Sequence, residues 1–234
     1  MARIPGGGIA ARNPFGPDWG AKRGQETSGS QSVGQQVQGE LFGKKKPPVL
    51  DEDDADISRL MGRLHTYRKK LARLAGDQES DYDLVLSAGT IASIDGEGLI
   101  YVGKNFLLNL ADALEVQVGV LAHEIGHRPK RWSEYKQKVA LTKSEKEELC
   151  RLEETRADYF AGKALAELDI DCEPLIQFLA AVQTMPHPEY FPPHVRADCI
   201  REGFRDGKRK AGNQKRFFPE LARMTSAKGD LGIG

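Results

Sequence analysis

The chain of 234 residues is poor in several kinds of residue, and each shortage narrows its class. It has only three cysteines, a small and odd number that does not indicate a disulfide framework. They predict reduced thiols in a cytoplasmic protein. No run of about 18 apolar residues occurs, so no transmembrane helix is expected. The N-terminus also lacks the apolar core of a secretory signal peptide. Basic and acidic residues balance at 34 each, so a nucleic-acid partner is not expected.

Large apolar residues are also scarce at the start of the chain. Residues 1–50 hold glycine-rich and Gln/Ser-rich runs, and burial there could not offset the entropy lost on ordering. We expect a disordered tail, with a pro-segment that covers a functional site until it is removed as the alternative. The predicted organisation is therefore this tail, a folded domain over 51–207 and a basic C-terminal tail over 208–234.

Histidine is scarce too, and this makes one segment stand out. Only five histidines occur, and two of them, His123 and His127, lie four residues apart in the run His-Glu-Ile-Gly-His. Residues at this spacing share one face of an α-helix, so both imidazoles can reach one metal ion. Zinc suits this donor set, and Glu124 is placed to take a proton from a water molecule at the metal. The apolar residues before His123 predict that this helix is buried.

A catalytic zinc ion normally has three protein ligands. A second helix is predicted over Glu145–Glu167, where a capping-box pattern opens it. Within it Glu154 and Asp158 face the same way, and Ala157 is small enough to let this helix approach the first. The spacing favours Glu154 as the third ligand and Asp158 as the acceptor that orients a ligand imidazole. Glu153 is the rival ligand, rotated by about 100° around the helix.

The remaining patterns predict the fold class. Apolar residues at three- and four-residue spacings indicate a helix over residues 56–75. Strand-like segments follow at 82–86, 90–94 and 99–102, and the glycine-containing run 95–98 joins the last two as a hairpin turn. The rest is helical in pattern. We therefore expect an α+β fold, mostly helical, with a small antiparallel sheet beside the zinc helix.

The two motifs together resemble a known family. H-E-x-x-H followed one helix later by E-x-x-A-D is similar to the pattern of the gluzincin zinc metallopeptidases of family M-48, the HtpX-like, Oma-like, BepA-like and CAAX prenyl endopeptidase group. The resemblance covers residues 56–205. Residues 98–108 resemble the strand and short helix ahead of the zinc helix, and 158–168 the helix that continues from the glutamate ligand. The resemblance implies a zincin-type domain that holds one Zn2+ ion and hydrolyses peptide bonds.

The same resemblance implies a substrate strand and a stabilising histidine. In gluzincins the edge strand of the sheet binds the peptide as one more strand. The corresponding residues here are Leu99, Ile100, Tyr101 and Val102. A His-Pro pair and a later arginine also follow the ligands in the family, and the histidine is thought to stabilise the transition state. Here His187 carries the flanking prolines, whereas His194 lies closer to Arg196. Either histidine could act, and His187 is preferred.

The sequence therefore predicts a zinc-dependent metalloendopeptidase that acts on a protein or peptide substrate. His123, His127 and Glu154 would hold the metal, and Glu124 would be the general base. The alternative is a proteolytically silent zinc-containing binding or regulatory protein whose cleft is blocked by its own tail. The presence of Glu124 argues against this alternative, because a purely structural site does not need that carboxylate.

Overall fold

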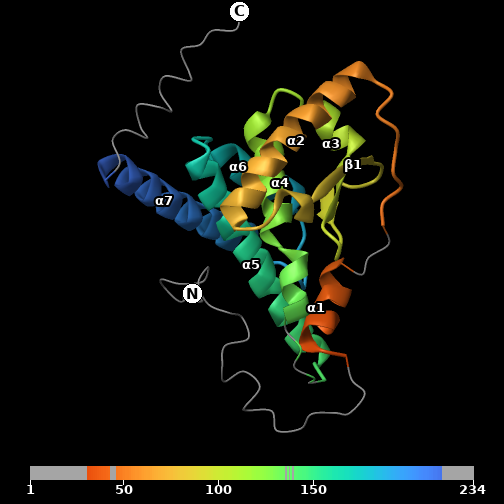
Figure 1. Cartoon of the computed structure of the whole chain (residues 1–234). Helices are drawn as coiled ribbons and strands as arrows, with labels where there is room; N and C mark the ends of the chain where they lie inside the picture. The colour runs from red at the N-terminus through yellow and green to blue at the C-terminus, as the bar shows by residue number, and fades with distance from the viewer. Residues whose placement is uncertain (1–30, 43–45, 135, 137, 139, 218–234) are drawn as a thin grey trace, which may run out of the picture.

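The computed structural model describes residues 31–42, 46–134, 136, 138 and 140–217, which form a mostly helical α+β domain (Figure 1). This confirms the predicted fold class. The helices are α1 (Val33–Phe42), α2 (Ala55–Ala75), α3 (Lys104–Asn109), α4 (Leu114–Gly126), α5 (Lys143–Glu167), α6 (Glu173–Val182) and α7 (Pro193–Phe217), with 3-10 turns η1 (Glu79–Asp81) and η2 (Pro129–Glu134). The strands are β1 (Asp83–Ser87), β2 (Ala92–Ile94) and β3 (Leu99–Gly103). No helix in these described ranges is long and apolar enough to cross a membrane.

The sheet is mixed, so the prediction of an antiparallel sheet is wrong for one of its two strand pairs. The strand order is β1-β3-β2, and β3 runs parallel to β1 but antiparallel to β2. The predicted hairpin turn does join β2 to β3, and Gly98 takes a φ of 92° there. The chain reverses twice between β1 and β3, so these two strands run the same way and pair side by side.

The central position of β3 overturns a second prediction. Ile100 of β3 lies opposite Leu84 of β1 and Ile94 of β2, so both sides of the strand are paired. The residues proposed as a substrate edge strand, Leu99, Ile100, Tyr101 and Val102, therefore cannot add a peptide. The strand at the edge of the sheet next to α4 is β2.

The N-terminal segment is not wholly a tail. Residues 33–42 form α1, in which Val33 and Val37 are buried against Trp132, Leu141 and Leu149 in a small apolar cluster of their own. Residues 48–50 pair with the outer side of β1 through hydrogen bonds between Leu50 N and Leu86 O and between Ala88 N and Pro48 O. At the other end, α7 runs past the predicted boundary at 207 to residue 217. The predictions for residues 1–30 and 218–234 lie outside the described residues.

Helix α4 lies at the centre of the domain, between α2, the sheet and α5 (Figure 1). It is buried along most of its length, as its apolar sequence predicted. It meets α5 closely at Gly126, where an added Cβ would lie 2.9 Å from the Cα of Ala157. Ala157, the small residue that was expected to allow this approach, thus lies at the crossing point, opposite Gly126, which has no side chain.

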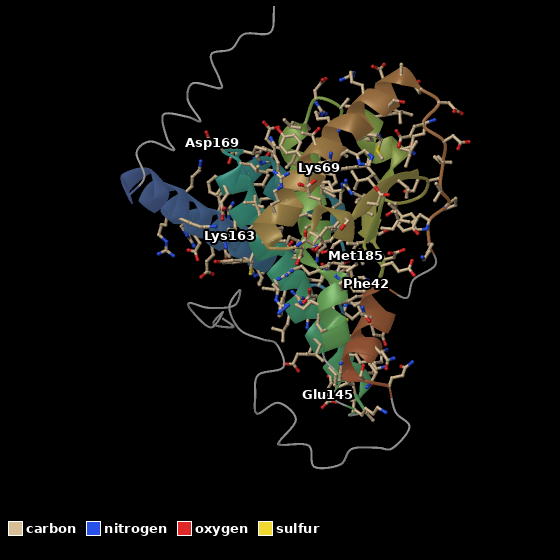
Figure 2. The ribbon with its side chains drawn as sticks, viewed as in Figure 1. Phe42, Lys69, Glu145, Lys163, Asp169 and Met185 are labelled. Carbon is tan, nitrogen blue, oxygen red and sulfur yellow. The ribbon has the colours of Figure 1, made fainter. Side chains whose placement is uncertain are left out.

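Helices α5 and α7 also touch backbone to backbone. Helix α5 is long: Figure 2 labels Glu145 in its first turn and Asp169 just beyond its end. An added Cβ at Gly162 of α5 would clash with the Ile200 carbonyl oxygen of α7, and one at Gly203 of α7 would clash with the Tyr159 carbonyl oxygen of α5. Only glycine fits at these two positions.

We predict that Gly162→Ala lowers the free energy of unfolding by at least about 2 kcal/mol, because the new methyl group must push two helix backbones apart. Urea unfolding of the purified variant measures this change. The control is Gly62→Ala in α2, where an added Cβ meets nothing within 4 Å. That variant should gain roughly 0.5–1 kcal/mol from the better helix propensity of alanine. Equal effects of the two substitutions would contradict the close contact.

Candidate metal centre

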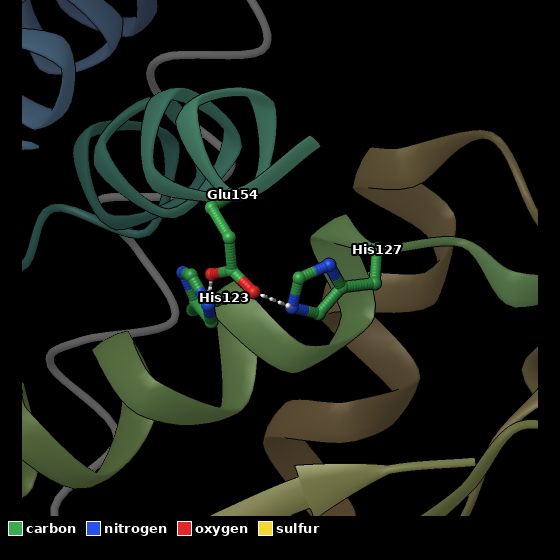
Figure 3. Close-up of side chains that lie close together, drawn as sticks. All are labelled: His123, His127 and Glu154. Carbon is green, nitrogen blue, oxygen red and sulfur yellow. Dashed lines mark ion pairs between the residues drawn. The ribbon is translucent and has the colours of Figure 1, made fainter. Parts of the chain in front are cut away.

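The structure brings together the three predicted metal ligands from two helices (Figure 3). His123 lies in the last turn of α4, His127 is the residue directly after its end, and Glu154 extends from α5 between them. Nε2 of His123 lies 3.1 Å from Oε2 of Glu154, and Nε2 of His127 lies 3.8 Å from Oε1. Ligand atoms around a tetrahedral zinc ion are about 3.3 Å apart, given bonds near 2 Å. This group could therefore hold a metal ion with little rearrangement.

Asp158 has the orienting position predicted for it. Its Oδ1 lies 2.9 Å from Nδ1 of His123, which leaves Nε2 of that ring facing the metal position. Asp158 is fully buried and also accepts two hydrogen bonds from Arg196, at 2.7 Å from Nε and 2.9 Å from Nη2. Arg196 thus neutralises the carboxylate that holds the ligand ring.

The rival ligand Glu153 points elsewhere. It is completely buried and pairs with Arg131 at 2.5 Å and with Arg156 at 3.1 Å. Arg131 lies in η2 and Arg156 in α5, so these ion pairs lie where η2 packs against α5. Glu153 therefore fixes the segment that follows the metal helix, and Glu154 alone of the two reaches the histidines.

The pKa values of the two imidazoles are shifted in opposite directions in the ion-free protein. Burial acts to lower the pKa of His123, but contacts with Asp158 and Glu154 outweigh burial and raise this pKa to about 10. Burial dominates at His127, whose pKa is lowered to about 4. A metal ion must therefore displace a proton from His123 but not from His127.

Glu124 is the buried carboxylate beside this group. Burial raises its pKa to about 7, because few polar groups compensate the charge. The backbone N–H of Ile94 in β2 donates a hydrogen bond to it. A carboxylate with a pKa near neutrality can both accept and return a proton, which is the property required of an acid–base group.

A cleft of about 360 Å³ opens beside His123 and Glu124. Its lining is mostly apolar and includes Ile91, Ala92, Val120, Leu175, Phe178, Leu179, Val182 and Met185. The polar lining residues, besides His123 and Glu124, are Gln183, Thr184, His187, Tyr190 and Arg196. Three large apolar side chains at this cleft are exposed, Ile91 by 38%, Val182 by 44% and Met185 by 74%. The cleft is thus open to solvent and suited to an apolar ligand group.

The two late histidines differ in their relation to the cleft. His187 is exposed but lines it, and its ring lies 5.0 Å from that of Tyr190. His194 is exposed at the start of α7 and is not among the residues that line it. Tyr190 was missed at the sequence level. Its signal was an aromatic residue inside the Pro-rich run between His187 and Arg196.

Comparisons with known proteins identify no family for this chain. No protein-family model matches it, and no curated protein gives a significant match.

We predict that Glu154→Gln weakens divalent-metal binding by at least about 100-fold, more than the 10–100-fold effect typical of groups outside the ligand set. The matched control Glu153→Gln, one residue away, should keep its metal. His123→Ala and His127→Ala should abolish binding. Metal content after dialysis measures all four variants. A metal-free Glu153→Gln beside a metal-replete Glu154→Gln would reverse the ligand assignment.

We also predict that the metal affinity of the wild-type protein rises with pH across the neutral range, as measured by titrating the protein with metal at several pH values. The reason is that His123, with its raised pKa, must lose a proton before it can bind.

Proposed function

We propose that the chain is a zinc-dependent metalloendopeptidase of the gluzincin type, related to family M-48. The observation that carries the proposal is the joint placement of two imidazoles and one carboxylate around a common point, with Glu124 buried beside them at an open cleft. Three protein ligands leave a fourth zinc position open, as in catalytic sites. A structural zinc site would have four protein ligands and no need of a neighbouring base.

The chain's own residues would share the work of hydrolysis. His123, His127 and Glu154 would hold the zinc ion, which supplies Lewis acidity when bound. Glu124 would accept a proton from the attacking water and pass it to the nitrogen of the leaving amine. Its pKa, raised to about 7 by burial in the ion-free protein, favours this exchange.

Strand β2 is the substrate strand that this proposal requires, in place of β3. Backbone hydrogen bonds join Asp95 N to Leu99 O and Gly103 N to Ile91 O. Because pairing alternates along an antiparallel ladder, the N–H and C=O groups of Ala92 and Ile94 point away from β3. Ala92 lines the cleft and the Ile94 N–H reaches Glu124, so this edge faces the catalytic group. An extended peptide would add here as a fourth strand.

The apolar lining of the cleft suggests the kind of peptide. Its helix α6 residues and the exposed Met185 would bury a large apolar side chain of the substrate next to the scissile bond. We therefore propose extended protein or peptide segments with such side chains as substrates.

The alternative is a proteolytically silent zinc-binding protein with its cleft blocked by its own tail. Of the described residues, none from α1 lines the cleft. Among the described side chains Glu124 forms no salt bridge, and burial raises its pKa to about 7. A silent protein would have no use for a carboxyl group that can exchange a proton near neutral pH.

We predict that Glu124→Gln keeps the fold and the zinc ion but slows peptide hydrolysis by at least about 100-fold, because the amide cannot accept a proton. Turnover of an unfolded protein substrate, measured at equal zinc occupancy with and without chelator, tests this. Glu115→Gln at the start of α4 is the control and should leave turnover unchanged. Wild-type protein that holds zinc and cleaves nothing would support the silent alternative.

A further inference from the structure

Tyr190 lies in the loop between α6 and α7, and its side chain is part of the cleft wall. Two neighbours hold its ring. The guanidinium of Arg196 lies 5.0 Å from the ring centroid, and the His187 ring meets it in a T-shaped contact at 5.0 Å. Because Arg196 is bonded through both Nε and Nη2 to the buried Asp158, the tyrosine ring rests on the same support as the His123 imidazole.

The Tyr190 hydroxyl is available to a ligand. Within the described part of the chain, no group forms a hydrogen bond with it, although the Tyr190 backbone N–H bonds to His187 O. The negative charge of Glu154, together with burial and the charge of Glu124, raises the pKa of Tyr190 well above its ordinary value. Tyr190 lines the same cleft as His123 and Glu124, and its phenol is protonated, so the hydroxyl can donate a hydrogen bond into the cleft.

We propose that Tyr190, rather than His187 or His194, is the residue that stabilises the oxyanion. The proposal rests on the proposed peptidase function. As water adds to the scissile carbonyl, a C–O bond forms, Glu124 takes the proton and negative charge gathers on the carbonyl oxygen. The phenol donates a hydrogen bond to that oxygen and keeps its own proton. The C–N bond then breaks as Glu124 returns the proton to the nitrogen.

His187 has a different part in this arrangement. It is exposed and contacts the ring of Tyr190, so it restricts where the phenol points. It is therefore a positioning residue for Tyr190. Its loss should cost less than the loss of the hydroxyl itself.

The test is Tyr190→Phe in the zinc-loaded full chain, which removes one oxygen and keeps the ring on Arg196. We expect kcat to fall by about 10²–10³-fold, the effect of losing one oxyanion donor, with KM and zinc content little changed. Binding of a phosphonate peptide, which mimics the tetrahedral geometry, should weaken by a similar factor. Tyr67→Phe in α2 is the matched control and should change neither quantity.

The possible results separate the two proposals. If Tyr190→Phe keeps full turnover while Glu124→Gln loses it, the Tyr190 inference is overturned and the peptidase proposal stands. If zinc-loaded wild-type protein hydrolyses no peptide, the peptidase proposal falls and the Tyr190 role falls with it. A larger kcat loss in His187→Ala than in Tyr190→Phe would return the oxyanion role to the histidine.

A second, independent observation concerns α1 and the opposite side of the metal group. Phe42, the last residue of α1, meets the His127 ring at a centroid distance of 6.0 Å and an interplanar angle of 81°. Gln38 Nε2 donates to Pro129 O at 2.9 Å, just beyond the end of α4, and Leu141 N donates to Gln36 Oε1 at 3.0 Å. Helix α1 thus holds both ends of the segment that links the two ligand helices.

We infer that Phe42 positions His127 for metal binding, so that α1 retains the metal rather than blocking the cleft. The edge-to-face contact limits the ring rotation of His127, whose Nδ1 is buried without a hydrogen-bond partner among the described residues. In most metal sites a hydrogen bond at the second ring nitrogen fixes the imidazole. Here an aromatic contact takes over that task.

Phe42→Ala should speed the loss of metal to a chelator by roughly 10-fold, within the range for groups that orient a ligand. Leu41→Ala is the control and should have little effect, because Leu41 lies in the same helix but packs only on the small apolar cluster around Trp132. Phe42→Tyr should restore slow release, and the absorption spectrum of bound cobalt should change in Phe42→Ala alone. Equal release rates for Phe42→Ala and Leu41→Ala, or an unchanged cobalt spectrum, would overturn the inference. None of these readouts depends on peptide hydrolysis.

Discussion

The buried carboxylate of Asp158 joins the parts of this molecule that matter for its proposed chemistry. It extends from α5, contacts His123 of α4 at 2.9 Å and accepts two hydrogen bonds from Arg196 of α7. A buried charge is tolerated only when it is paired and hydrogen-bonded, so the three helices are obliged to meet at this point. The same contacts fix which nitrogen of His123 faces the metal position. Fold and site thus depend on the contacts of this one carboxylate.

Much of the metal group could be predicted because it is local in sequence. The spacing of His123 and His127, and of Glu154 and Asp158, is converted into shared faces by helix geometry alone. The choice of Glu154 over Glu153 followed from that geometry, and the structure agrees, with Glu153 bonded to Arg131 and Arg156. Local periodicity was sufficient here because no contact between distant strands was involved.

The errors of prediction arise where distant segments must choose partners. Nothing in Leu99–Val102 indicates that β1 and β2 will cover both of its sides, since strand order is a property of the whole sheet. Helix α1 was hidden by the polar composition around it, although Val33, Val37 and Leu41 are spaced four apart. The place of Tyr190 in the cleft lining depends on the path of the proline-rich loop between α6 and α7, and no periodicity in the sequence predicts that path.

The glycine contacts between α5 and α7 have a mechanical consequence. At Gly162 and Gly203 the backbones of the two helices are in direct contact, with no side chain between them. Such close packing would make α5 and α7 move together as one rigid unit. Helix α4 meets α5 in a similar way, because Gly126 faces the backbone of Ala157 where the two helices cross. The histidines and the glutamate are therefore carried by helices that are in direct backbone contact. The three side chains would then be held ready before an ion arrives, so binding an ion would require little movement of the helices.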